Sequence, residues 1–288
     1  MKTFEYFLAR LVLGTLSATP LPVSRKLANL YALLLDIAVP RLRRTAIKNL
    51  EMAGFAGRER IATGIFHSIA RLALTFARFP KISRQNVSQW IRYEGLENFE
   101  NARARGKGVL IATAHLGNWE FSAFAHAYLS APMHVVVRPI DNYKIDAMVE
   151  HRRGLSGNRI ISKKQAARSI LRALAAGGAV GILIDQNTTP SEGVFIDFFG
   201  VQACAGTAFV KLANHSGAAV VPGYALWSEK EAKYVLTFEP EVEMTGDLKQ
   251  DTQRVHARLE TAIRKYPDQW LWIHRRWKTR PPGEASIY

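Results

Sequence analysis

The sequence of 288 residues contains a single cysteine, Cys204. One cysteine excludes an intramolecular disulfide and any zinc site built from cysteines, and it is compatible with a reducing compartment. Cys204 stands between two alanines ahead of a predicted helix, which favours a small buried side chain over a nucleophile. The chemistry of this protein must therefore rest on other side chains.

Several motifs with a defined chemistry are also missing. The sequence has no Gly-x-Ser-x-Gly segment, which argues against a hydrolase with that serine nucleophile. It has neither the phosphate-loop signature nor a Gly-x-Gly-x-x-Gly fingerprint, and its histidines do not have the spacing of metal ligands. The sequence therefore predicts a protein without a cofactor and without a metal.

Long uncharged apolar runs are absent too. The first apolar segment, residues 4–19, contains Glu5 and Arg10, and the second, residues 27–39, contains Asp36. Neither meets the pattern of a membrane span, and the acidic residue near the start argues against a secretory signal peptide. We expect two helices that lie in or on the bilayer interface, separated by a pair of prolines; a buried helical hairpin is the alternative.

Acidic residues are in short supply. Lys and Arg number 39 against 24 Asp and Glu, which gives a net charge of +15. Residues 1–93 hold 15 Lys or Arg and 4 Asp or Glu, and so carry +11 of this charge. A concentrated basic surface attracts polyanions: nucleic acid, acidic lipid head groups or an acidic carrier protein. A charge excess that only aids solubility is the alternative.

The apolar pattern divides the chain into two parts. Residues 1–90 have helical periodicity, which predicts a basic, membrane-associating helical region. From residue 91 onward, short apolar strands alternate with helices, which is typical of an α/β core with a largely parallel sheet flanked by helices. We expect the two parts to form one continuous domain. The predicted strands are residues 108–114, 133–138, 179–185 and 218–226, with an edge or antiparallel strand at 234–238. The predicted helices are residues 118–129, 143–154, 164–176, 206–216 and 251–265.

A histidine and a glutamate mark the end of the first apolar strand. His115 follows the strand directly, and Glu120 comes five residues later. Five helical steps rotate a side chain by about 140°, so the two can meet only if His115 lies in a turn before the helix, which Gly117 allows. Glu120 could then hydrogen-bond one imidazole nitrogen and make the other a general base for a hydroxyl. A buried structural histidine would explain this pair equally well.

Arginines follow the second predicted strand. Arg138 stands at the strand end, and Arg152 and Arg153 lie in the next helix. Guanidinium groups at the carboxyl edge of a sheet suit phosphate or carboxylate binding. For the adjacent pair, a solvated helix end that stabilises the helix dipole is the alternative.

Polar residues also end the third strand. Asp185 and Gln186 stand there, and burial of Asp185 would require a partner, for which one of the arginines is attractive. Glu192 follows in a predicted turn and completes the candidate substrate-binding residues. The apolar run 194–199 either lines an acyl-chain groove or belongs to the core.

The C-terminal segment 267–278 combines three tryptophans with His274, Arg275, Arg276 and Lys278. Tryptophan beside basic residues suits a membrane interface, and it would also suit single-stranded nucleic acid. A terminal helix that closes the core through its tryptophans is the third interpretation.

Taken together, these segments resemble the lipid A biosynthesis acyltransferases, the late lauroyl and myristoyl transferases of Gram-negative bacteria. Residues 114–120 resemble the His-x-x-x-x-Glu signature of the wider glycerolipid acyltransferases. The resemblance is ordered, covers roughly residues 1–280, and rests on six segments: AHLGNWE at 114–120, RPIDN at 138–142, HRRG at 151–154, DQN with EGVFIDFFG at 185–200, VVPGY at 220–224 and QWLWIHRRWK at 269–278.

The resemblance implies an O-acyltransferase at the cytoplasmic face of the bacterial inner membrane, peripheral or anchored by its N-terminal helix. Acyl carrier protein would donate the acyl chain to a hydroxyl of an anionic, acylated and phosphorylated glucosamine disaccharide. His115 would be the base and Glu120 its partner, the later arginines would bind phosphate, and backbone N–H groups near Gly117 would stabilise the oxyanion. No nucleic-acid partner is expected. The family often has proline where this chain has Tyr143, which leaves the exact acceptor open.

Three rivals remain. The protein could acylate another glycolipid or a phospholipid. It could be a non-catalytic basic protein that binds membranes or nucleic acid. It could also be a thioesterase-like hydrolase that releases free fatty acid without an acceptor.

Overall fold

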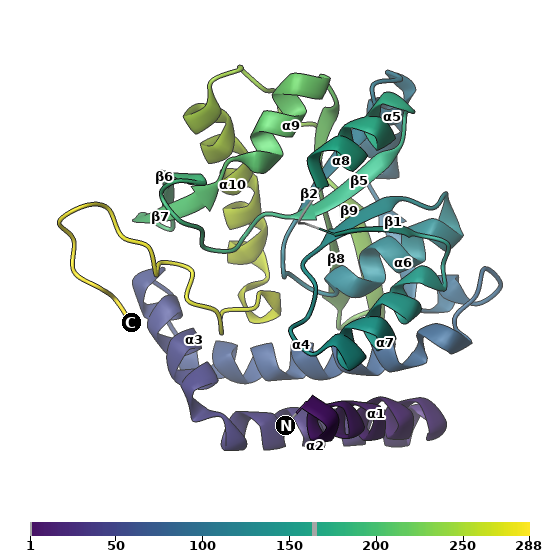
Figure 1. Cartoon of the computed structure of the whole chain (residues 1–288). Helices are drawn as coiled ribbons and strands as arrows, with labels where there is room; N and C mark the ends of the chain where they lie inside the picture. Colours follow the sequence, from purple (N-terminus) through teal and green to yellow (C-terminus); the bar gives the residue numbers. More distant parts are fainter. Residues whose placement is uncertain (1, 163–165) are drawn as a thin grey trace.

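Four helices build the N-terminal part of the protein (Figure 1). The computed structural model describes residues 2–162 and 166–288. Pro22 lies in the first turn of the second helix and Pro40 opens the third, positions at which the missing N–H of proline costs no helical hydrogen bond. The predicted helical character of residues 1–90 is confirmed. The helices are α1 (Lys2–Ala18), α2 (Leu21–Ala38), α3 (Pro40–Met52) and α4 (Arg58–Arg78), followed by the 3₁₀ turns Phe79–Lys81 and Val87–Gln89.

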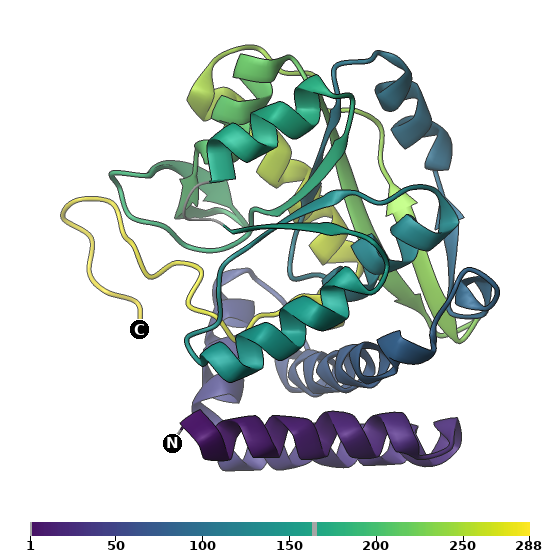
Figure 2. The ribbon, with the colours of Figure 1, turned by 45° about the vertical axis from the view of Figure 1, so that its right-hand side comes forward.

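Helix α4 joins this helical layer to the rest of the molecule. Its apolar residues Phe66, Ala70 and Leu74 are buried in a cluster with Leu16 of α1 and with small residues of α2. Its opposite side contacts α6 (Trp119–Leu129). Figures 1 and 2 show α1 and α2 side by side beyond α4, as an outer layer of the protein. Within the described residues, no helix has the length and apolar character needed to cross a membrane.

A seven-stranded sheet forms the centre of the α/β part. The strand order is β1-β9-β8-β2-β5-β3-β4, and every pairing is parallel except that between β8 and β9. The predicted α/β class with a largely parallel sheet is therefore confirmed. The last predicted strand, β9, is antiparallel to β8 but is not at the edge, because β1 pairs with its other side. The strands are β1 (Ile91–Glu94), β2 (Val109–Thr113), β3 (His134–Val137), β4 (Arg159–Ser162), β5 (Ala179–Leu183), β8 (Ala219–Ser228) and β9 (Lys233–Phe238).

Helices cover both faces of this sheet. Along β2, Val109 and Ile111 face a core formed with α5 and α6, whereas Leu110 and Ala112 face a core formed with α8, α9 and α10. This alternation follows from the two-residue period of a strand. The predicted helices are found, and residues 164 and 165 of one of them lie outside the described residues. The helices after α4 are α5 (Leu96–Ala104), α6, α7 (Tyr143–Gly154), α8 (Ala166–Ala175), α9 (Ala208–Ser216) and α10 (Leu248–Lys265).

The sheet opens between β3 and β5. These strands pair at only two positions, the second being Val135 with Gly181. Both strands stay paired with their other neighbours for two residues more, to Val137 in β3 and to Leu183 in β5. The two halves of the sheet therefore separate toward the carboxyl ends of the strands, where α/β proteins place their sites.

A hairpin and the C-terminal segment cover the core next to the C-terminal end of β2. The hairpin consists of β6 (Gly193–Phe198) and β7 (Val201–Gly206). Phe198 and Phe199 are buried among the three C-terminal tryptophans, so the second half of the 194–199 run belongs to the core. Apart from the 3₁₀ turn Pro267–Gln269, the C-terminal segment is not helical.

The burial of the tryptophans decides between the interpretations of that segment. Trp270, Trp272 and Trp277 are each 0% exposed, so they can neither lie in a membrane interface nor stack on nucleic acid. Those two interpretations are wrong. The tryptophans close the core, although without the terminal helix that the third interpretation assumed.

Gly117 shows how tightly the turn after β2 is held. Its φ is +63°, and a Cβ placed there would lie 2.1 Å from the carbonyl oxygen of Ala225. We expect Gly117→Ala to lower the free energy of unfolding by about 1–3 kcal/mol more than Gly106→Ala, because overpacking adds to the cost of the left-handed backbone. Gly106 has a φ of +73° and no atom within 4 Å of such a Cβ, so it isolates the backbone cost. Urea unfolding of both variants measures the difference; equal losses would contradict it.

Candidate active site

His115 lies in the short connection between β2 and α6. The strand ends at Thr113 and the helix begins at Trp119, after Asn118, whose side chain accepts a hydrogen bond from the backbone N–H of Phe121. This cap fixes the start of α6. The predicted placement of His115 in a turn that contains Gly117 is confirmed.

The partner of the imidazole is Asp185, two residues beyond the end of β5. The distance between Nδ1 of His115 and Oδ1 of Asp185 is 2.9 Å, and the backbone N–H of His115 donates to Oδ2 over 3.0 Å. Asp185 is 0% exposed. The expected pairing of Asp185 with an arginine is therefore wrong: β2 and β5 are neighbouring parallel strands, and their ends bring the aspartate to the histidine.

These contacts determine which nitrogen can act as a base. An ionised carboxylate only accepts hydrogen bonds, so Nδ1 of a neutral His115 carries the proton and donates it to Asp185. Nε2 then has a free lone pair, and it makes no hydrogen bond to the described residues. The side chain of His115 keeps 16% of its surface exposed and borders a large cavity. This arrangement is suited to removing a proton from a bound hydroxyl.

The charges around His115 favour its protonated form. Burial lowers the pKa of His115, but the charge and hydrogen bond of Asp185, together with the charge of Glu120, outweigh burial and raise it above 6.5. Burial raises the pKa of Asp185, yet the contacts with His115, His274 and Trp270 outweigh it and hold the pKa below its usual range. Asp185 therefore stays ionised near neutral pH.

Glu120 does not hydrogen-bond His115, and the expected contact is corrected here. Both of its carboxylate oxygens accept from Arg153, with Oε2 2.8 Å from Nε and Oε1 2.5 Å from Nη2. The two side chains are only 13% and 19% exposed, so this bidentate pair is largely desolvated. Glu120 is the second residue of α6, and the helix directs its side chain toward Arg153 of α7 and away from the turn that holds His115. Its charge still acts on the imidazole through space.

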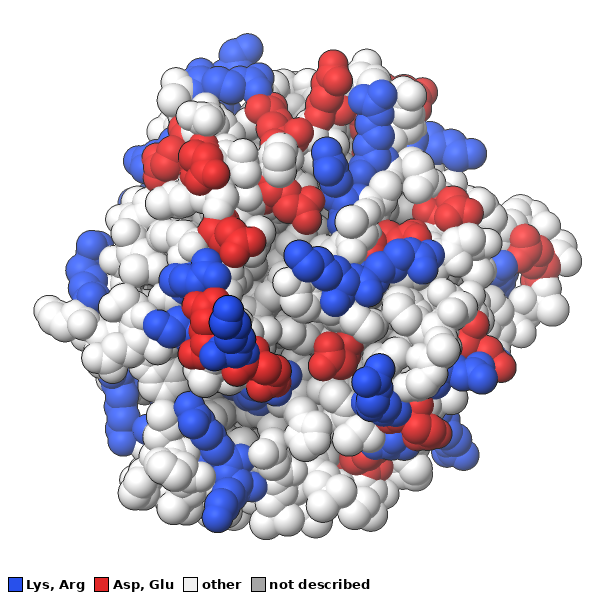
Figure 3. All heavy atoms as spheres, turned by 180° about the vertical axis from the view of Figure 1, so that it is seen from behind, with Lys and Arg blue, Asp and Glu red and all other residues white. Residues whose placement is uncertain are grey.

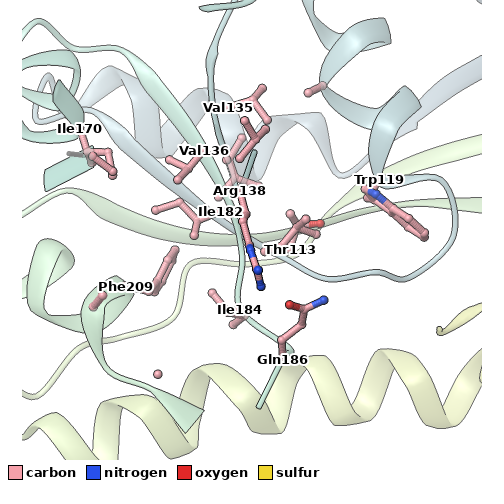
Figure 4. A pocket seen from close by; sticks show the side chains of 18 of the residues that line it. Thr113, Trp119, Val135, Val136, Arg138, Ile170, Ile182, Ile184, Gln186 and Phe209 are labelled. Atoms are coloured by element: carbon pink, nitrogen blue, oxygen red, sulfur yellow. The ribbon is translucent and has the colours of Figure 1, made fainter. Parts of the chain in front are cut away.

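A cavity of about 1450 Å³ extends from His115 into the opening of the sheet. Figure 4 shows Val136, Ile182, Ile184 and Phe209 on its wall, with Arg138 extending toward Gln186. Residues 135–137 of β3 and 181–183 of β5 line it on the two sides of the opening in the sheet. Its lining is mainly apolar, with polar groups concentrated near the carboxyl ends of the strands.

The other predicted site residues divide into two groups. Arg138, Arg153, Gln186 and Glu192 line the cavity. Arg152 does not: its guanidinium donates to the carbonyl oxygens of Phe76 and Ala77 at the end of α4, and so stabilises that helix end. The solvated-helix-end alternative is also wrong for Arg152, since its partners belong to another helix.

The backbone N–H groups of Gly117 and Asn118 already have acceptors. The N–H of Gly117 donates to the carbonyl of Gln269 and that of Asn118 donates to the carbonyl of Ala225, each over 2.8 Å. These two groups are therefore not available to stabilise an oxyanion, and the expectation is wrong for them. Among the described residues, no group of three or more His, Cys, Asp or Glu side chains is arranged to hold a metal.

Comparison with known proteins identifies the family. The model of a family described as bacterial lipid A biosynthesis acyltransferase matches residues 1–279. The chain belongs to this family. It is 32% identical over 263 residues to the lipid A biosynthesis palmitoleoyltransferase of Escherichia coli K12, covering 88% of this chain and 85% of that protein. It is 29% identical over 207 residues to the lauroyltransferase of the same strain, covering 71% and 67%. It is 23% identical over 252 residues to the myristoyltransferase, covering 85% and 78%.

The resemblance inferred from the sequence is thus confirmed, and the protein is an acyltransferase of the lipid A biosynthesis family. Its segments of resemblance come together in space. The segment 114–120 carries His115, the segment 185–200 carries Asp185, and the segment 269–278 contributes Trp270, whose indole N–H donates to Asp185 over 2.8 Å. The position of Asp185 at a strand end indicated that it belongs to the site, but the sequence did not indicate that His115 is its partner.

The pKa of His115 gives a direct test of this site. We expect NMR titration of the histidines to place the pKa of His115 above 6.5 in the unaltered lipid A acyltransferase and lower in Asp185→Asn, because burial then acts with little opposition. His126 and His256, whose pKa burial lowers to about 4, serve as internal controls that stay neutral. An unchanged midpoint for His115 in Asp185→Asn would refute the pairing.

Proposed function

We propose that this acyltransferase moves a fatty acyl chain from acyl carrier protein to a hydroxyl of an anionic lipid A precursor, with His115 as the general base. Membership of the family supports a lipid A acceptor. The observation that carries the proposal is the imidazole of His115, which borders a large, mainly apolar cavity while a buried Asp185 holds its Nδ1 and leaves Nε2 without a hydrogen bond to the described residues.

The proposed reaction is direct transfer in a ternary complex. Nε2 of His115 takes the proton of the acceptor hydroxyl as the hydroxyl oxygen attacks the thioester carbonyl. The C–S bond of the tetrahedral intermediate then breaks, and the departing thiolate takes the proton back from the imidazolium. Ester and free thiol are formed, with no acyl group on the protein. Asp185 stabilises the imidazolium in between. The thioester is already activated, so no metal or cofactor is required.

The two ends of the cavity suit the two parts of the substrates. We propose that the acyl chain lies in the apolar region where β3 and β5 separate. Arg138, Gln186 and Glu192, near the strand ends, would bind polar groups of the donor or acceptor. Arg138 fits an anion because its side chain is 78% exposed and its contact with Asp141 is long, at 3.9 Å.

We propose a supporting role for Glu120. Its carboxylate holds Arg153 at the edge of the cavity and fixes α7 to α6, and its negative charge favours the imidazolium formed during transfer. Arg153 is then a fixed cation on the lining of the same cavity as His115, where it could stabilise negative charge on a substrate.

The N-terminal helices suit a membrane surface. The large apolar residues of α1 that stay exposed recur at helical spacing on one face, and those of α2 do the same. Basic residues such as Arg10 and Arg25 are exposed next to them. Figure 3 shows a mostly uncharged lower edge, where Figure 1 places these helices, interrupted mainly by Lys and Arg. We propose that this face lies in the interface of the inner membrane, on its cytoplasmic side. The exposed apolar residues are Phe4, Phe7, Leu8 and Leu11 of α1, and Val23, Leu30, Leu33, Leu34 and Ile37 of α2.

Acyl transfer is tested with purified protein and acyl carrier protein loaded with a series of acyl chains. The acceptors are an acylated, phosphorylated glucosamine disaccharide, a phospholipid, or none, and products are identified by mass. We expect acylation of the disaccharide, and we expect His115→Ala to lower the rate by at least about 10²-fold. His67→Ala, at an exposed histidine, keeps the activity.

Other outcomes identify the rivals. Acylation of only the phospholipid would assign a different acceptor. Fatty acid released at the same rate without an acceptor would indicate a thioesterase. Equal activity of His115→Ala and the unaltered protein would remove His115 from the mechanism and favour a non-catalytic role.

Membrane binding is tested by sedimentation with vesicles of phosphatidylethanolamine and phosphatidylglycerol. We expect the double variant Phe7→Asp, Leu33→Asp to bind at least about 10-fold more weakly, since each buried apolar side chain contributes about 1.5–3 kcal/mol. The charge-matched control Ala257→Asp, Thr261→Asp, on the exposed side of α10, changes binding much less. Equal weakening in both variants would mean that charge alone drives the association.

A further inference from the structure

The C-terminal segment packs along the turn between β2 and α6 that contains His115. The backbone N–H of Leu271 donates to the carbonyl of His115 over 2.9 Å, and the N–H of Gly117 donates to the carbonyl of Gln269 over 2.8 Å. Leu116 and Trp270 form an antiparallel bridge between these two hydrogen bonds. The backbone of the turn is therefore fixed by a segment about 150 residues further along the chain.

The side chain of Trp270 reaches the carboxylate itself. Its indole Nε1–H donates to Oδ2 of Asp185 over 2.8 Å, and Oδ2 also accepts from the backbone N–H of His115. Oδ1 is left for Nδ1 of His115. With both oxygens occupied, the carboxylate cannot rotate about its own axis without losing hydrogen bonds in a site from which water is excluded.

Packing fixes the orientation of the indole. Trp270 is 0% exposed, and its ring lies edge-on to Trp272 and Phe198, with ring centroids 4.5 and 5.8 Å away. Because neighbouring side chains pack against it on all sides, the indole is restricted to one rotamer, and its N–H points in one direction. The donor is therefore in position before any substrate binds.

We propose that Trp270 is a positioning residue of the catalytic site, which holds Asp185 in the orientation that keeps His115 aligned as the base. This inference rests on the proposed function of His115. It extends the catalytic arrangement from two residues to three, with the third supplied by the C-terminal segment. Groups that orient the partner of a functional histidine commonly contribute 10- to 100-fold when they are removed.

The chain offers a matched control in Trp272. This tryptophan is also 0% exposed, lies in the same segment, and donates its indole N–H over 2.7 Å, but to the backbone carbonyl of Pro267 instead of Asp185. Phenylalanine at either position removes one indole hydrogen bond and leaves a similar cavity. Only the change at Trp270 removes a hydrogen bond to Asp185.

The experiment compares Trp270→Phe and Trp272→Phe by steady-state kinetics and by NMR titration of His115. We expect Trp270→Phe to lower kcat about 10- to 100-fold with little change in KM. The pKa of His115 should move in the same direction as in Asp185→Asn, and by less. We expect Trp272→Phe, which keeps an aromatic ring against Trp270, to lower kcat and to shift this pKa clearly less than Trp270→Phe does, whatever stability it loses. In an Asp185→Asn background, Trp270→Phe should add no further loss of kcat.

Two results would overturn the proposal: equal loss of kcat in both variants, or an unchanged pKa of His115 in Trp270→Phe. If Trp270→Phe does not fold, the unaltered protein decides the question, because the indole N–H resonance of Trp270 should titrate with the midpoint of His115 and that of Trp272 should not. The NMR measurements do not depend on the substrate. Absence of acyl transfer by the unaltered protein would therefore refute the proposed function without removing the test of Trp270.

Discussion

The buried contact between Asp185 and His115 is the constraint on which the rest of the site depends. An ionised carboxylate is costly to bury unless it is hydrogen-bonded and charge-compensated. Both carboxylate oxygens of Asp185 accept hydrogen bonds. The fully buried guanidinium of Arg276, in the C-terminal segment, supplies positive charge. Burial lowers the pKa of Arg276 to about 10, against the opposing effect of Asp185, so the guanidinium remains charged at neutral pH.

This constraint explains why distant parts of the chain meet at one point. The ends of the neighbouring strands β2 and β5 bring the histidine and the aspartate together, and the C-terminal segment closes over them. On the other side of His115, the early separation of β3 from β5 leaves room for the cavity. His115, the proposed base, thus lies between a buried wall and an apolar space, an arrangement suited to the proposed attack of an alcohol on a thioester at the end of a long chain.

Much of the fold could be predicted from the sequence because uninterrupted apolar strands and amphipathic helices have clear patterns. Four strands were missed. Strands β1 and β4 have four residues each, and Arg92, Glu94 and Arg159 interrupt their apolar pattern, while β6 and β7 form a separate hairpin outside the main sheet. The pairing of Asp185 with His115 could not be derived, since the residues are 70 positions apart and strand order is not written in periodicity. The different partners of Arg152 and Arg153 could not be predicted either. Adjacent helical residues point about 100° apart, and the sequence does not show what lies on each side of α7.

In the proposed mechanism, His115 activates the acceptor hydroxyl for direct transfer, and no acyl group passes through the protein. A decisive measurement uses acyl carrier protein with a labelled acyl chain, quenches the reaction during the first turnover, and determines the masses of the intact protein and of the lipid. Direct transfer predicts an unmodified protein mass at every time, with label appearing in the lipid only when the acceptor is present. A labelled acyl adduct on the protein, formed and consumed at the rate of turnover, would contradict it.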